Sequence, residues 1–119
     1  MIKFICYPKC TTCQKAQQWL DGNNVKYTLR DIKLDNPNIR ELLEWHKKSG
    51  LPLKKFFNTS GLLYKSLALK EKIPDMTEDE MLQLLASDGM LVKRPLIIGE
   101  NFVLVGFKET EWQRLTGVE

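Results

Sequence analysis

The chain has 119 residues, which suits a single domain with a hydrophobic core of its own. Its hydrophobic fraction of 43% and charged fraction of 28% are typical of globular proteins. The net charge of +3 is too small to predict direct binding of nucleic acid or of a membrane surface. Neither the N-terminus nor the apolar segment 96–107 resembles a signal peptide or a membrane span, so we expect a cytoplasmic protein.

The predicted elements begin with a strand, a helix and a second strand. Residues 2–7 are mostly apolar or aromatic and predict a short strand. The apolar residues within 16–20 have helical spacing, and the polar residues 21–24 end that helix. Residues 25–29 alternate apolar and polar side chains and predict the second strand. A strand–helix–strand unit of this length predicts that the two strands are parallel.

A predominantly helical region of about residues 36–90 comes next. Thr77 and Glu80 have the spacing of a capping box, which predicts the start of a helix. The predicted elements are a helix at 36–50 with Ile39, Leu42, Leu43 and His46 along one side, one or two turns at 52–57, a short helix at 62–69 and a clearer helix at 77–86.

Two strands and a helix complete the predicted chain. The strands are expected at 96–98 and 102–105, joined by the hairpin loop 99–101, and the helix at 108–115. The resulting order is β-α-β, a helical insertion, then β-β-α, which predicts one α/β domain over residues 1–119 with a mixed sheet. The pattern does not decide whether Trp112 lies in the core or at the surface.

The chemistry of the sequence is concentrated in a Cys-x-x-Cys motif, Cys10-Thr11-Thr12-Cys13, between the first strand and the first helix. The unpaired N–H groups of a first helical turn favour a thiolate, so we expect the Cys10 sulfur to accept hydrogen bonds from them. The spacing lets Cys13 reach back and displace a group bound to Cys10. The motif therefore predicts Cys10 as an exposed nucleophile and Cys13 as a more buried resolving thiol.

Three other interpretations of the cysteines stay open. A zinc site would need four ligands, and only Cys6 and the single histidine, His46, could add to the pair. The spacing Cys6-x3-Cys10-x2-Cys13 matches the iron–sulfur loop of radical-SAM enzymes, but Cys6 falls near the end of a predicted strand. The pair could also be inert and packed. We expect no metal, and we expect Cys6 to be a small buried apolar residue.

The sequence resembles the ArsC/Spx family. The resemblance is carried by residues 7–16, which include Pro-x-Cys-Thr-Thr-Cys-x-Lys-Ala, and by residues 58–61, 64–67 and 93–98, and it extends over essentially the whole chain. It implies a thioredoxin-like fold of the glutaredoxin type.

The resemblance also implies roles for residues near the cysteines. Arg94-Pro95 would place a cis-proline beside the cysteine loop, where the backbone can pair with an extended substrate. Arg94 would act with Cys10 and Cys13 by placing a positive charge next to Cys10. The remaining implied substrate-binding residues are Thr11, Thr12 and Pro95.

The chain resembles the Cys-x-x-Cys members of the family, such as Spx, more than its arsenate reductases. Those reductases hold the oxyanion with several arginines, whereas this chain has no arginine between Arg40 and Arg94 or between Arg94 and Arg114, and it has Cys13 where they have serine. We therefore expect a thiol–disulfide oxidoreductase without a bound cofactor, with glutathione, glutaredoxin or thioredoxin as electron donor or partner. The alternatives are an Spx-type redox-sensing regulator that binds the RNA polymerase alpha subunit and, less favoured, a glutaredoxin-dependent arsenate reductase.

Overall fold

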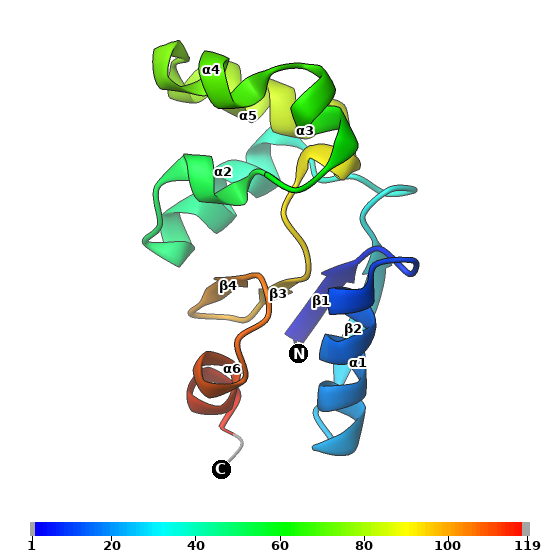
Figure 1. The fold of residues 1–119 in the computed structure, drawn as a ribbon. Coiled ribbons are helices and arrows are strands. Elements are labelled where there is room, and N and C mark those ends of the chain that lie inside the picture. Colours follow the sequence, from blue (N-terminus) through cyan, green and yellow to red (C-terminus); the bar gives the residue numbers. More distant parts are fainter. Residues whose placement is uncertain (1, 118–119) are drawn as a thin grey trace.

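A four-stranded mixed sheet forms the centre of the molecule, which a computed structural model describes over residues 2–117 (Figure 1). The strands lie in the order β2-β1-β3-β4, with β1 and β2 parallel and the other two pairs antiparallel. This arrangement confirms the predicted thioredoxin-like fold and the parallel first unit. The strand bounds are β1 (Ile2–Cys6), β2 (Tyr27–Asp31), β3 (Leu96–Ile98) and β4 (Val103–Val105).

The first helix, α1 (Thr11–Gly22), packs its buried side chains Cys13, Ala16 and Leu20 against one face of the sheet. The prediction of β2 at 25–29 was wrong by two residues. The Val25 N–H donates to the Leu20 carbonyl at 2.9 Å, so Val25 belongs to the turn that closes α1, and pairing with β1 begins only at Tyr27.

The region between β2 and β3 is helical, as predicted, and Figure 1 shows it as a separate layer beyond the sheet. The predicted helix at 62–69 is interrupted because Ala68 adopts a left-handed conformation with φ of 53°. The elements are α2 (Ile39–Ser49), η1 (Leu53–Phe56), α3 (Leu62–Ser66), α4 (Leu69–Lys72), η2 (Ile73–Asp75), α5 (Glu78–Ser87) and η3 (Gly89–Leu91).

The buried side of α2 differs from the predicted one. Leu42 and Trp45 are the buried residues, whereas Ile39 and Leu43 are 43% and 40% exposed. The helix packs against α5 and β4 along the Leu42–Trp45 line, which leaves the other predicted residues at its border. Among those, His46 is half-buried with its ring edge-on to Phe56 at 6.2 Å.

Two capping boxes begin the longer helices of this layer. The predicted box of α5 is confirmed, because the Thr77 side chain accepts from the Glu80 N–H and the Glu80 carboxylate accepts from the Thr77 N–H. In α2 the corresponding carboxylate, that of Glu41, also pairs with the Arg30 guanidinium through contacts of 2.6 and 3.0 Å. The Arg30 bonds hold the pKa of Glu41 below its usual value and tie the end of β2 to α2.

The two faces of the sheet build two hydrophobic clusters. Phe4, Cys6 and Leu104 face α1 and the last helix, α6 (Glu109–Thr116), whereas Ile5 and Leu96 face the helical layer. Trp112, whose position the sequence left open, is fully buried in the first cluster.

Gly89 marks the closest approach between the helical layer and the loop after β2. A Cβ atom at this position would overlap the carbonyl oxygen of Ile32, so the backbone packing excludes any side chain there. Because Gly89 opens η3, this contact fixes the segment that leads into the cysteine site. Within residues 2–117, no helix has the length and apolar character needed to cross a membrane.

Candidate functional site

The cysteine loop joins β1 to α1 and holds Cys10 at the N-cap of the helix. Cys10 has extended backbone angles (φ −84°, ψ 123°), and its N–H donates to the Tyr7 carbonyl at 2.9 Å. The Gln14 side chain reaches back to the Pro8 carbonyl at 2.9 Å. These bonds fix a tight turn that presents the half-buried Cys10 thiol at the surface.

Hydrogen bonding of the two motif cysteines differs from our expectation. In the part of the chain that the structure describes, the Cys10 side chain caps no N–H of the first helical turn. Instead, the buried Cys13 sulfur accepts the Tyr7 N–H at 3.3 Å. Cys10 instead lines a pocket, where its half-buried thiol is open to an incoming group.

Cys13 lies between the other two thiols. Its thiol is hydrogen-bonded to Cys6, and that bond together with burial raises the pKa of Cys13. The pKa of Cys6 is lowered because its sulfur accepts the hydrogen bond from Cys13, an effect that burial and the Asp31 carboxylate oppose. Cys6 is buried as predicted, but it is not merely an apolar residue, because its sulfur contacts the motif.

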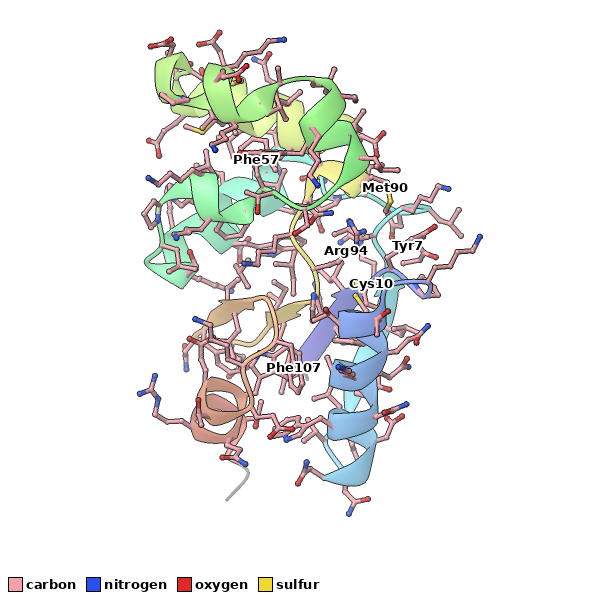
Figure 2. The ribbon with its side chains drawn as sticks, in the orientation of Figure 1. Tyr7, Cys10, Phe57, Met90, Arg94 and Phe107 are labelled. Atoms are coloured by element: carbon pink, nitrogen blue, oxygen red, sulfur yellow. The ribbon has the colours of Figure 1, made fainter. Side chains whose placement is uncertain are left out.

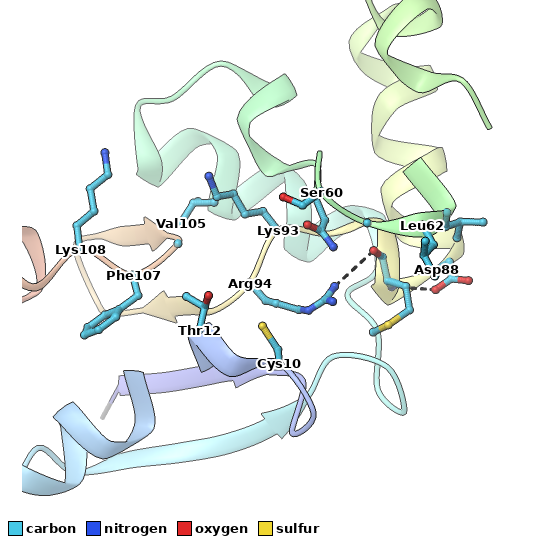
Figure 3. A pocket seen from close by; sticks show the side chains of 15 residues that line it. Cys10, Thr12, Ser60, Leu62, Asp88, Lys93, Arg94, Val105, Phe107 and Lys108 are labelled. Atoms are coloured by element: carbon cyan, nitrogen blue, oxygen red, sulfur yellow. Dashed lines mark hydrogen bonds between the residues drawn. The ribbon is translucent and has the colours of Figure 1, made fainter. Parts of the chain in front are cut away.

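A pocket of about 750 Å³ opens in front of Cys10 (Figure 3). Figure 2 shows where it lies, between α1 and the helical layer, with Tyr7, Cys10, Arg94 and Met90 on the same side of the molecule. The lining residues are Cys10, Thr12, Asn58, Ser60, Gly61, Leu62, Leu63, Asp88, Met90, Lys93, Arg94, Val105, Gly106, Phe107 and Lys108. Three cationic side chains and one carboxylate make this pocket positive on balance.

Arg94 crosses the pocket wall beside Cys10, as Figure 3 shows. Its guanidinium lies 5.2 Å from the centre of the Tyr7 ring, and Nη1 makes a long 3.5 Å bond to the Met90 carbonyl. The Nε atom is buried and has no hydrogen-bond partner among residues 2–117. Because a buried donor of this kind is costly when unpaired, the site favours an acceptor from a ligand.

The wall opposite α1 is held by backbone bonds around Pro95. The Arg94–Pro95 peptide is cis, as the resemblance implied. The Pro95 carbonyl accepts the Gly106 N–H at 2.8 Å, and the Gly106 carbonyl accepts the indole N–H of Trp112 at 3.1 Å. The buried indole thereby anchors the pocket-lining loop after β4.

The structure brings most of the predicted site residues together. Cys10, Thr12 and Arg94 line the pocket, and Cys13 lies buried directly behind Cys10. Thr11 is exposed outside the pocket lining, and Pro95 is buried beneath it. Sequence reasoning missed the part played by Tyr7, whose backbone and ring contact Cys10, Cys13 and Arg94. Its position three residues before Cys10, at the end of the predicted first strand, was the available signal.

The three cysteines do not form a recognisable metal centre. Within the described range 2–117, no group of three or more His, Cys, Asp or Glu side chains is arranged to hold a metal ion. His46 lies on α2 and faces Phe56 and Glu78, with the Glu78 carboxylate 3.8 Å from Nε2. The fourth ligand considered for zinc is therefore engaged elsewhere in the fold.

Comparison with known proteins identifies the family. The sequence model of the ArsC family matches residues 6–115, which span the cysteine loop, the helical layer and the wall around Pro95. The chain belongs to the ArsC family. A crystal structure of an ArsC family related protein from Bacteroides fragilis is 58% identical to it, covers 96% of each chain and superimposes with a TM-score of 0.94.

Other relatives of this ArsC-family chain carry different descriptions. The uncharacterized protein YusI of Bacillus subtilis is 51% identical over 94% of this chain and 95% of its own length. The crystal structure of a possible arsenate reductase from Streptococcus mutans is 46% identical, covers 91% and 92% of the two chains and has a TM-score of 0.84. The regulatory protein MgsR of Bacillus subtilis is 26% identical over 97% of this chain and 90% of its own.

Proposed function

We propose that this ArsC-family protein is a thiol–disulfide oxidoreductase that acts on small anionic disulfides. The observation that carries the proposal is the arrangement of the motif. The Cys10 thiol lines a pocket of net positive charge, and the Cys13 thiol is buried next to it. The unpaired Arg94 Nε adds a donor for a ligand carboxylate next to the reacting sulfur.

In the proposed reaction, the Cys10 thiolate attacks one sulfur of the substrate disulfide, and the other half leaves as a thiolate. Cys13 loses its proton and attacks the Cys10 sulfur of the mixed disulfide, which releases the second half and forms the Cys10–Cys13 disulfide. Two electrons pass from the cysteine pair to the substrate, and each released thiolate takes up a proton. One reduced thioredoxin, or two glutathione molecules where the substrate is a different disulfide, return the two electrons.

The buried state of Cys13 gives the order of events a physical basis. Its raised pKa keeps it protonated while Cys10 reacts, so the first attack comes from the accessible thiol. Once Cys10 is bound in a mixed disulfide, Cys13 is the neighbouring thiol one helical turn along and is shielded from solvent competitors.

The test uses glutathione disulfide as substrate and reduced thioredoxin as electron donor, and it follows the reduction of glutathione disulfide by the full-length protein. We expect Cys10→Ser to abolish turnover, and Cys13→Ser to accumulate a glutathione adduct on Cys10 that mass spectrometry detects. Arg40→Met, which changes an exposed arginine on α2 outside the pocket, should retain full turnover. Turnover in Cys10→Ser protein equal to that of the unmodified chain would refute the proposal.

A second candidate is a redox-sensing regulator of transcription, favoured by the match to MgsR over nearly the whole of both chains. The same cysteine pair would then change a protein-binding surface instead of turning over a substrate. A binding assay with the purified RNA polymerase alpha subunit and the reduced or oxidised protein tests this. Binding that depends on the Cys10–Cys13 disulfide, without turnover of glutathione disulfide, would replace the first proposal by this one.

Arsenate reduction is the weakest of the three. A trivalent oxyanion needs several preorganised donors, and the described lining offers Arg94 as its one arginine, with Lys93 and Lys108 as point charges. The likeness to the Streptococcus mutans protein makes the assay necessary. We expect arsenate reduction with glutathione and glutaredoxin to be no faster than with the Cys10→Ser protein.

A further inference from the structure

Cys6, the third cysteine, is placed against the site by the alternation of β1. Side chains at successive strand positions face opposite sides of a sheet, so Phe4 and Cys6 face α1 while Ile5 faces the helical layer. Cys13 points back from the first turn of α1 into the same buried cluster. The two sulfurs therefore meet between the end of β1 and the start of α1, and Cys6 and Cys13 are 3% and 1% exposed.

All three thiols gather at this place: Cys6 and Cys13 belong to one buried cluster, and the half-buried Cys10 packs against it. The Cys13 sulfur also accepts the Tyr7 N–H at 3.3 Å, which holds it at the start of α1. The pKa of Cys6 is lowered and that of Cys13 is raised by their interaction with each other. A small apolar residue would fill the place of Cys6 equally well, but it could not act as a nucleophile.

We propose that Cys6 is a third redox thiol, which displaces Cys10 from the Cys10–Cys13 disulfide and forms a buried Cys6–Cys13 disulfide. This step rests on the proposed oxidoreductase function. The Cys6 sulfur gives up its proton and bonds to the Cys13 sulfur, the Cys10–Cys13 bond breaks, and Cys10 leaves as a thiolate. No electrons enter or leave the protein, so the step needs no further oxidant.

The consequence is that an oxidised molecule regains a free Cys10. The disulfide moves from the pocket mouth, where a thiol reductant can reach it, to a site buried by β1 and α1. Cys10 can then react with a second substrate molecule while the buried Cys6–Cys13 disulfide retains the two-electron oxidation from the first. The protein would hold more oxidising equivalents than a protein with the motif pair alone.

The tryptic map of the chain reports on this disulfide directly. Cleavage after Lys3, Lys9 and Lys15 separates residues 4–9, which contain Cys6, from residues 10–15, which contain both motif cysteines. A Cys10–Cys13 disulfide stays inside one peptide, whereas a Cys6–Cys13 disulfide joins two. The experiment oxidises the full-length reduced protein with one molar equivalent of glutathione disulfide, labels accessible thiols with iodoacetamide, quenches in acid and sequences the peptides by mass spectrometry.

We expect oxidised unmodified protein to contain the linked peptides with the iodoacetamide label on Cys10. In Cys6→Ala protein the label on Cys10 after oxidation should fall at least tenfold, because no Cys6 thiol is present to displace Cys10 from the Cys10–Cys13 disulfide. In Cys10→Ser protein, oxidation by diamide should lower the free thiol count from two to none. The matched variant Cys13→Ser also keeps two cysteines, and its count should remain two.

Failure of the inference about Cys6 and failure of the proposed oxidoreductase function give different results. If Cys6→Ala and unmodified protein both turn over glutathione disulfide, but the 4–9 peptide is never linked and Cys10→Ser keeps two thiols, Cys6 is a packing residue and only this inference is wrong. If neither the unmodified protein nor the Cys6→Ala protein turns over substrate or forms the Cys10–Cys13 disulfide while both remain folded by circular dichroism, the inference and the proposed function are both overturned. Cys6→Ser provides a second folded variant should Cys6→Ala not fold.

Discussion

Replacement of Arg94 by methionine separates ligand binding from stability. In the free protein the change removes a buried, unpartnered Nε donor, whose burial costs about 1–3 kcal/mol. It also removes the contact with the Tyr7 ring at 5.2 Å, which contributes about 0.5–2 kcal/mol. The long bond to the Met90 carbonyl adds little. These effects nearly cancel, so we expect the free energy of unfolding in urea to change by no more than about 1 kcal/mol.

The same change should weaken recognition of a charged substrate. A hydrogen bond from a guanidinium to a carboxylate contributes about 1.5–3 kcal/mol, which corresponds to a factor of about 10–150 in kcat/KM. The measurement is the ratio of kcat/KM for glutathione disulfide to that for uncharged hydroxyethyl disulfide. Any effect of the arginine on the Cys10 sulfur itself cancels in this ratio, because both substrates react with the same thiol.

The matched control is Arg40→Met, which removes an equal charge from the exposed surface of α2. Its ratio should equal that of the unmodified protein. An unchanged ratio in Arg94→Met would refute the argument that the buried Nε binds a ligand carboxylate. A loss of stability above about 3 kcal/mol would refute the argument that this donor is unsatisfied in the free protein.

Three further predictions concern stability and pH. Glu41→Gln keeps the capping geometry but removes the charge paired with Arg30. Because that pair lowers the pKa of Glu41 below 4.5, the unmodified protein should lose stability as the pH falls below 4.5, and the variant should lose less. Urea unfolding at several pH values tests this, and equal losses of stability in the two proteins would contradict it. Gly89→Ala should cost at least about 2 kcal/mol because its Cβ overlaps backbone, while Gly22→Ala, with open space around it, serves as the control in thermal unfolding. Trp112→Phe should cost about 2–3 kcal/mol by leaving the buried Gly106 carbonyl without its donor, and urea unfolding that shows a cost below 1 kcal/mol would contradict that reading.

The sequence was most informative where a local rule and the global fold agree. The strand–helix–strand opening, the capping box at Thr77 and the Cys10–Cys13 motif each depend on residues close together in the chain, and each is confirmed in position. The start of β2 was missed because the Val25 amide is taken by the end of α1, a bond that alternation of side chains does not reveal.

The features that sequence alone left undetermined depend on contacts between distant segments. The burial of Trp112 follows from its packing against Phe4 and Phe107 at 6.3 and 4.8 Å, which requires the sheet to be in place. The shared burial of Cys6 and Cys13 likewise depends on how α1 lies against β1. Helical spacing at 36–50 predicted a helix but not which side of it α5 would cover.

The hydrogen bond from the Tyr7 N–H to the Cys13 sulfur makes the Tyr7 amide sensitive to the redox state of Cys13. A disulfide of Cys13 moves its sulfur toward the partner thiol and weakens it as an acceptor, so the amide proton of Tyr7 should exchange with deuterium more quickly in the oxidised protein than in the reduced one. Its NMR cross-peak should shift in the same titration. A single backbone resonance would therefore record the redox state of the centre without any label on the cysteines themselves.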